Sequence, residues 1–221
     1  RTLMPGLIDA HWHTLLVRPR FTELLTVDVG YLNVLGAAEA NATLMRGFTT
    51  VRDVGGPSFG LKRAIDEGVL PGPRIYPSGA AMVADGPDEV TVRVREQLLQ
   101  GASQIKLTAG GGVSSPHSPL DVSTFTDAEL RAAVEAATNW GTYVTVHAYT
   151  PAAIQRAITA GVQCIEHGHL MDDATARMMA EKGVWLSMQP LPDALAESFP
   201  PGSEQRAKAF EVFAGTARTY E

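Results

Sequence analysis

Two of the six histidines in this 221-residue chain stand one residue apart, at the end of an apolar run near its start. The stretch GLIDAHWHT contains both, His11 and His13. Side chains at positions i and i+2 of a strand share a face, so both imidazoles would lie on one side and Trp12 on the other. Two imidazoles on one face can bind one metal ion. The alternative is two polar side chains that are hydrogen-bonded at a strand end.

Three more residues of this kind follow short apolar stretches further along. Lys106 lies within QIKLT, His147 is the penultimate residue of YVTVHA, and His167 is the last residue of CIEH. Alternation places Ile105 and Leu107 on the helix-covered face and Lys106 on the other. Burial and nearby cations would lower the pKa of its amine, and a neutral amine can react with carbon dioxide to form a carbamate. The alternative is a lysine that reaches out to water or pairs with an acid.

The sequence around these residues predicts the elements that position them. Short apolar segments alternate with longer periodic ones, and in TDAE, Thr126 and Glu129 form a capping box. We expect seven strands, at residues 4–10, 49–53, 74–78, 104–108, 143–148, 164–167 and 184–189. Each strand is followed by helical sequence. This order predicts an α/β fold with a parallel sheet, doubly wound or closed as a (β/α)8 barrel. Polar residues near the carboxyl ends of four strands, and the lack of a glycine-rich first turn, favour the barrel.

Composition limits the classes of partner. The chain is 45% hydrophobic and has a formal net charge of -6, with acids and bases dispersed along it. It shows no basic stripe for nucleic acid and no polybasic helix for a membrane surface. We therefore expect a small-molecule substrate and favour a cytoplasmic location. The single cysteine, Cys164, excludes an internal disulfide, so a metal would have nitrogen and oxygen ligands.

Five stretches, in chain order, carry a resemblance: MPGLIDAHWH, GFTTVRDVGG, GASQIKLTAGGG, VTVHAYT and IEHGH. Together they resemble the amidohydrolase superfamily, in particular its group of bacterial Xaa-Pro dipeptidases, ochratoxinases and imidazolonepropionase-related enzymes. The resemblance implies a TIM barrel with two divalent metal ions, expected to be zinc. It implies that His11 and His13 bind one ion, His147 and His167 bind the other, and a carboxylated Lys106 bridges them. A hydroxide that bridges the metals would attack the substrate.

The resemblance also implies hydrolysis of a C–N amide bond. We expect a dipeptidase or carboxypeptidase-like enzyme that acts on dipeptides or N-acyl amino acids. The alternatives are a cyclic amidohydrolase that opens imidazolone or hydantoin rings, and an inactive metal-binding fragment. Tyr149 has the parity of His147 and could reach a substrate carboxylate, and His117 lies in a Gly-, Ser- and Pro-rich loop that could cover the site. Because family members often assemble, we expect a homo-oligomer.

Other positions have structural expectations. Asp53 is expected to stabilise the rim of the second strand, AGGGVSS to form a mobile loop, and His169 to lie in a loop. The family pattern breaks after RIYPSGA, where a long loop is missing, and at Glu221, where the chain stops before an eighth strand. In the family that strand usually carries the aspartate that moves a proton to the leaving nitrogen. We therefore expect one incomplete barrel domain over residues 1–221, without the eighth strand and the N-terminal β-sandwich segment.

Overall fold

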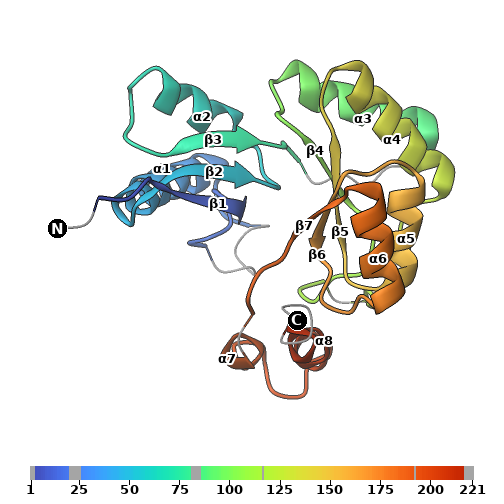
Figure 1. The fold of residues 1–221 in the computed structure, drawn as a ribbon. Helices are drawn as coiled ribbons and strands as arrows, with labels where there is room; N and C mark the ends of the chain where they lie inside the picture. The colour runs from blue at the N-terminus through green and yellow to red at the C-terminus, as the bar shows by residue number, and fades with distance from the viewer. Residues whose placement is uncertain (1–2, 20–25, 81–85, 116, 192, 217–221) are drawn as a thin grey trace. The chain divides into compact units, whose positions relative to one another are not determined.

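The computed structural model describes residues 3–19, 26–80, 86–115, 117–191 and 193–216. They form two compact units (Figure 1). Unit 1 consists of Arg1–Ala81 and Arg95–Lys106, and unit 2 of Met82–Val94 and Leu107–Glu221. The chain passes between the units within helix α3 (Pro87–Leu99) and strand β4 (Ile105–Thr108).

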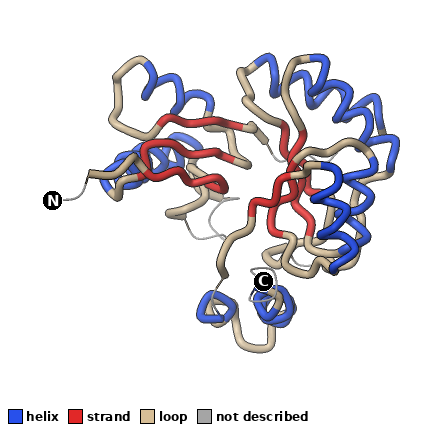
Figure 2. Tube along the Cα trace, in the orientation of Figure 1, coloured by secondary structure: helices blue, strands red, loops and turns tan. Residues whose placement is uncertain are grey.

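Unit 1 is built on a three-stranded sheet in the order β1-β2-β3, and both strand pairs are parallel (Figure 2). Its strands are β1 (Leu7–Trp12), β2 (Phe48–Asp53) and β3 (Arg74–Pro77). Helices α1 (Val29–Met45) and α2 (Phe59–Asp66) follow the first two strands. One buried cluster contains a residue from each of these five elements: Trp12, Ala40, Val51, Leu61 and Ile75. Trp12 thus packs towards the helices, as strand alternation predicts.

A buried carboxylate ties the loop after β1 to α1. Glu39 accepts a hydrogen bond from Arg18 Nε at 2.7 Å and another from the Arg46 guanidinium. Burial raises the pKa of the Glu39 carboxyl, but the hydrogen bonds and charges of the two arginines outweigh it, so this pKa lies below its ordinary value. Glu39 is therefore ionised at neutral pH and holds the loop that follows His13.

Unit 2 contains most of a four-stranded sheet in the order β4-β5-β6-β7. Its further strands are β5 (Val144–Ala148), β6 (Cys164–His167) and β7 (Trp185–Ser187), and the β5–β6 and β6–β7 pairs are parallel. Figure 1 shows helices α4, α5 and α6 side by side along the sheet. Their bounds are Asp127–Asn139, Pro151–Thr159 and Asp173–Lys182.

The C-terminal helices α7 (Asp193–Ala196) and α8 (Glu204–Ala214) pack over loops that follow the strands. A second buried cluster joins them to the loop after β4 and to the residue after β5: Val113, Leu120, Tyr149, Ala196, Ala209, Val212 and Phe213. The sequence predicted helical character after the seventh strand but not this packing. Both helices therefore shape the carboxyl-terminal edge of the sheet in unit 2.

The predicted α/β class with parallel strands is confirmed, and all seven predicted strands are present in the described part of the chain. The capping box is confirmed too, because Glu129 N donates to Thr126 Oγ1 at 3.3 Å and Thr126 N donates to Glu129 at 2.7 Å. The first strand begins at Leu7 rather than residue 4, since Pro5 has no N–H to give to a ladder. The short segment after RIYPSGA, at 81–85, lies outside the described residues. None of the described helices has the length and apolar character needed to cross a membrane.

Candidate functional site

The two histidines of unit 1 lie together at the end of β1. His11 is within the strand and His13 follows its last residue, Trp12. Their ring centroids are 5.1 Å apart with nearly perpendicular planes. Because Trp12 is buried against the helices, the two imidazoles are on the other side of the strand, as predicted.

A backbone carbonyl fixes the proton of His13. Nδ1 of His13 lies 3.1 Å from the carbonyl oxygen of Gly55, in the turn after β2. A carbonyl can only accept, so Nδ1 carries the hydrogen and the neutral ring has its lone pair on Nε2. Metal-binding histidines commonly donate their other ring N–H in this way. His13 is therefore prepared to bind a metal through Nε2.

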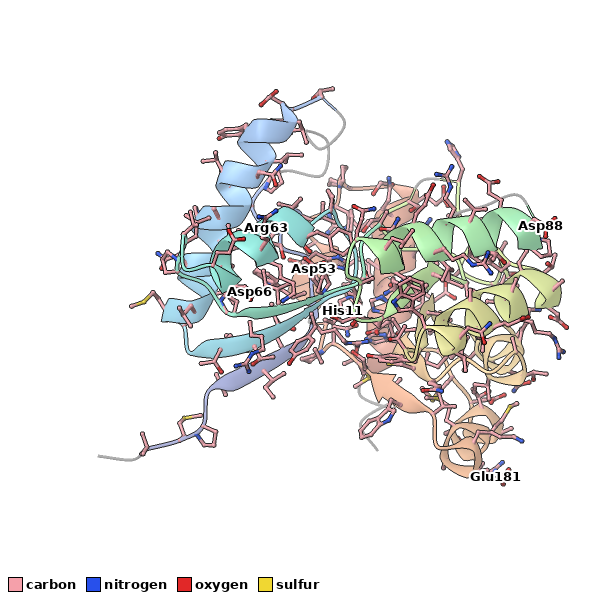
Figure 3. All side chains as sticks on the ribbon, turned by 90° about the horizontal axis from the view of Figure 1, so that it is seen from above. His11, Asp53, Arg63, Asp66, Asp88 and Glu181 are labelled. Atoms are coloured by element: carbon pink, nitrogen blue, oxygen red, sulfur yellow. The ribbon has the colours of Figure 1, made fainter. Side chains whose placement is uncertain are left out.

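Asp53, at the end of β2, holds the turn that contains Gly55. Its Oδ1 accepts from Gly55 N at 3.1 Å, and its Oδ2 accepts from Thr14 N at 3.2 Å and from Thr14 Oγ1. Burial raises the pKa of the Asp53 carboxyl, and hydrogen bonds from Thr14 and Gly55 offset part of that rise. Figure 3 labels Asp53 and His11, which lie at the same end of the sheet. Asp53 thus stabilises the strand rim, as expected.

The Asp53→Asn substitution should destabilise unit 1. Both carboxylate oxygens accept from backbone N–H groups, so either orientation of the amide places its NH₂ against a donor. We expect the free energy of unfolding to fall by on the order of 2 kcal/mol, measured by urea denaturation. The control Asp66→Asn loses one exposed i,i+4 pair with Lys62 and should cost about 0.5 kcal/mol or less. Equal effects of the two variants would contradict this role of Asp53.

The histidines of unit 2 form the second pair. His147 on β5 and His167 on the neighbouring β6 have ring centroids 4.4 Å apart. Nε2 of His147 lies 2.9 Å from the carbonyl oxygen of Gly111, so Nε2 carries the hydrogen and Nδ1 has the lone pair. His147 therefore offers Nδ1 to a metal, whereas His13 offers Nε2.

His167 reaches this pair through an unusual backbone conformation. The β5–β6 register pairs His147 with Glu166 and Ala148 with His167, so regular alternation would place the His167 side chain opposite to that of Glu166. His167 has a φ of 79°, a left-handed conformation that costs a non-glycine residue roughly 1–3 kcal/mol. Its ring nevertheless lies beside that of His147. Strain of this kind is typical of functional sites.

Lys106 is buried in the middle of β4. Only 4% of its surface is exposed, and its neighbours Ile105 and Leu107 are completely buried. The alternative in which Lys106 extends into water is therefore excluded. Two alternatives for its side chain are left, the carbamate and a pairing with an acid. Carboxylation of Lys106 stays a prediction.

Tyr149 lies beside the histidines of unit 2. Its ring centroid is 4.7 Å from that of His147 and 5.2 Å from that of His167. Burial raises the pKa of the Tyr149 phenol well above its ordinary value, so its hydroxyl is neutral at all working pH values. A neutral phenol can donate a hydrogen bond to a carboxylate.

The two remaining histidines have different surroundings. His117 is exposed in the loop after β4, where its backbone N–H donates to the Glu204 carboxylate of α8. Its predicted role in substrate binding stays a prediction. His169 lies in a loop, as expected, but it is buried, and its Nε2 lies 2.9 Å from the carbonyl oxygen of Gln189. Burial lowers the pKa of His169, which keeps it neutral and favours a structural role.

Glu166 is a buried acid of unit 2 that sequence reasoning missed. It is completely buried, and its Oε1 accepts from Thr145 Oγ1 at 2.5 Å and from Cys164 Sγ at 3.7 Å. The register places it on the same face as His147. The signal was present in IEHGH, because an acid inside a short apolar strand must point into a polar interior or find donors there.

The glycine-rich loop after β4, expected to be mobile, is instead held in place. Lys208 of α8 donates to the carbonyl oxygens of Ser115 and Ser118 at 2.8 and 3.1 Å. Val113 and Leu120 bury their side chains in the cluster with α8. The loop is held because its apolar side chains pack against α8 and its serine carbonyls accept hydrogen bonds from Lys208. The glycine-rich composition of the loop does not predict these contacts.

A cavity of about 270 Å³ on the outer surface of unit 1 is not a comparable candidate. Its charged lining residues pair with one another, Lys62 with Asp66 at 2.6 Å and Arg63 with Glu67 at 2.8 Å. Arg63 and Asp66 are labelled in Figure 3. No charge in this lining is left without its opposite, so nothing there selects a charged ligand.

The donor set as a whole fits a divalent transition metal. Imidazole nitrogens suit zinc and its neighbours, and in each unit a glycine carbonyl already fixes the proton of one histidine. Within the described residues, no group of three or more His, Cys, Asp or Glu side chains is close enough to hold a metal. The four candidate ligand histidines occur as one pair in each unit, and a zinc ion needs more ligands than one pair supplies.

Residues 2–202 match the sequence profile of the Amidohydrolase family. The chain belongs to this family. The resemblance inferred from the five motifs is thereby confirmed, and it extends beyond the short stretches that carried it.

Named relatives of this amidohydrolase chain include the ochratoxinase of Aspergillus niger, 29% identical over 222 residues. That match covers 82% of this chain and 46% of the ochratoxinase. Among solved structures, an amidohydrolase is 38% identical with a TM-score of 0.92, and a prolidase complexed with N-methylphosphonate-L-proline is 35% identical with a TM-score of 0.91. Each match covers 98% of this chain and 61% of the other. The chain spans about half the length of the curated relatives it matches.

Proposed function

We propose that this amidohydrolase hydrolyses C–N amide bonds in small substrates with a free carboxylate, such as dipeptides and N-acyl amino acids. The observation that carries the proposal is the His147–His167 pair, with its proton fixed by Gly111 and its strained backbone at His167. Neither feature is needed to fold a strand. The similarity to a prolidase and to ochratoxinase supports an amide as the bond that is cleaved.

The proposed centre has two divalent metal ions, with zinc expected. His11 and His13 would hold one ion, His147 and His167 would hold the other, and a carbamate on Lys106 would be a ligand to both. Such ions would polarise the amide carbonyl and lower the pKa of a water molecule. To form the carbamate, the neutral Nζ of Lys106 attacks carbon dioxide, an N–C bond forms as one C=O π bond opens to give a carboxylate oxygen, and one N–H proton passes to water. The product has the negative charge and the two oxygens that a bridge requires.

Tyr149 is the proposed recognition residue for the substrate carboxylate. Its phenol is held beside the histidine pair and stays neutral, so it donates a hydrogen bond without adding a charge. Because this bond forms to a part of the substrate that does not react, its loss should weaken binding more than it slows the reaction.

Steady-state kinetics on matched substrates tests this function. We expect hydrolysis of N-acyl amino acids and Xaa-Pro dipeptides, and Tyr149→Phe should raise KM for them about 10-fold with little change in kcat. The same substrates with an amidated carboxyl group serve as the control, and their KM should be equal in both proteins. Hydrolysis of hydantoin rings in place of these substrates would favour the cyclic amidohydrolase. Equal KM values of the variant and the native protein for free carboxylates would exclude this role of Tyr149.

A further inference from the structure

The loop after β4 contacts both the backbone and the side chain of His147. The carbonyl oxygen of His147 accepts from Ala109 N and Gly110 N, at 3.0 and 3.1 Å. The ring nitrogen Nε2 lies 2.9 Å from the carbonyl oxygen of Gly111. Whatever fixes this loop therefore also fixes the orientation and the proton of the His147 ring.

The loop has two limbs, one with Gly111 and Gly112 and the other with Ser118 and Pro119, and they pack tightly at Gly111. A Cβ at this position would lie 1.7 Å from the carbonyl oxygen of Pro119, so only glycine fits. Beside it, Gly112 N donates to Ser118 Oγ at 3.3 Å. The limb that carries Gly111 is thus positioned by the limb that carries Ser118 and Pro119.

The second limb is held by one side chain of α8. Lys208 is only 7% exposed, and its Nζ donates to the carbonyl oxygens of Ser115 and Ser118 and pairs with Glu204 at 3.1 Å. Glu204 in turn accepts from the backbone N–H of His117. These contacts join α8 to the loop at Ser115, His117 and Ser118.

We propose that Lys208 is a positioning residue for His147. A continuous path runs from Lys208 to Ser118, from Ser118 to Gly112, and from the adjoining Gly111 to the imidazole. With the path intact, the ring hydrogen stays on Nε2 and the lone pair stays on Nδ1. Without it, the neutral ring distributes between both tautomers and rotates more freely. The effect on metal binding rests on the proposed function, whereas the effect on the tautomer does not.

The Lys208→Met substitution tests this directly, because it keeps the apolar stem and removes the donors. In metal-free protein with ¹⁵N-labelled histidine, we expect the His147 resonances to change from the Nε2–H tautomer to a mixture of both, with assignment from a His147→Gln sample. Zinc affinity, measured by competition with a chelator, should fall about 10- to 100-fold. The matched control is Lys182→Met, at the exposed end of α6, which should leave both readouts unchanged. A native tautomer in Lys208→Met would overturn the proposal.

A pair of glycine variants keeps the test decisive should Lys208→Met fold poorly. Gly111→Ala forces the two limbs apart and should give the same tautomer mixture. In Gly112→Ala the nearest atom to the new Cβ is Ser115 Oγ at 3.6 Å, so the loop should stay in place. If Gly111→Ala keeps the native tautomer, the loop does not position His147. If the tautomers change as expected and the protein binds no metal, the proposed function fails and the positioning role stands.

Discussion

The Lys106→Arg variant should lose amide hydrolysis by about 10³-fold or more in kcat/KM. Arginine retains the positive charge and cannot be deprotonated, so it forms no carbamate. The position is almost completely buried, which prevents the side chain from leaving the strand face. Loss of a bridge that supports several kcal/mol of transition-state stabilisation corresponds to a rate effect of this size.

The matched control for this variant is Lys62→Arg, on the exposed surface of α2, which should retain native activity. A ¹³C resonance from protein equilibrated with labelled bicarbonate should be present in the native protein and absent from Lys106→Arg. Short carboxylic acids should partly restore a Lys106→Ala variant, because they replace the missing bridge. Native turnover in Lys106→Arg would show that the carbamate has no part in the reaction.

The His13→Ala and His147→Ala variants should each lose hydrolysis by about 10³-fold. In each residue one ring nitrogen is hydrogen-bonded to a glycine carbonyl, so the other ring nitrogen has the lone pair. If both histidines hold metal ions that the reaction needs, either substitution removes activity. Kinetics at saturating zinc would distinguish lost affinity, which excess metal restores, from lost chemistry.

The control histidine is His117, whose side chain is exposed on the loop after β4. His117→Ala should leave kcat unchanged, with any effect confined to KM. A His147→Ala variant with native kcat would place the reaction elsewhere. A loss in only one of these two variants would show that the other histidine takes no part in the reaction.

In both units the same kind of local contact sets the tautomer of a histidine. In each, a glycine in the turn after the neighbouring strand points its carbonyl at one ring nitrogen, Gly55 at His13 and Gly111 at His147. In each, a buried charged side chain, Asp53 or Lys208, holds that turn. The tautomers that result are opposite, so the lone pair is on Nε2 in His13 and on Nδ1 in His147.

Alternation and capping rules predicted much of this structure from the sequence. Trp12 packs towards the helices and the histidines beside it do not, because a two-residue period leaves no other choice for a half-covered strand. Thr126 and Glu129 begin α4 through bonds that depend on four consecutive residues only. Such features are local, and local sequence is sufficient to predict them.

Features that depend on distant segments were not predictable in this way. Gly111 is 36 residues from His147, and Lys208 is 90 residues from Ser118, so no sequence period connects them. Because of its strained φ, His167 places its side chain on the face opposite to the one that alternation predicts. A sequence pattern therefore cannot predict the direction of this side chain. The carboxylate of Glu166 accepts from Thr145, 21 residues away, so the stretch IEHGH alone does not show what Glu166 contacts.

Metal content tests the central claim most directly. Elemental analysis of the purified protein, after expression with added zinc, should find about two divalent ions per chain, and His13→Ala and His147→Ala should each contain fewer. X-ray absorption should then show imidazole nitrogens about 2.0–2.1 Å from zinc. Protein that folds, retains all five proposed ligands and still contains no divalent metal would contradict the account.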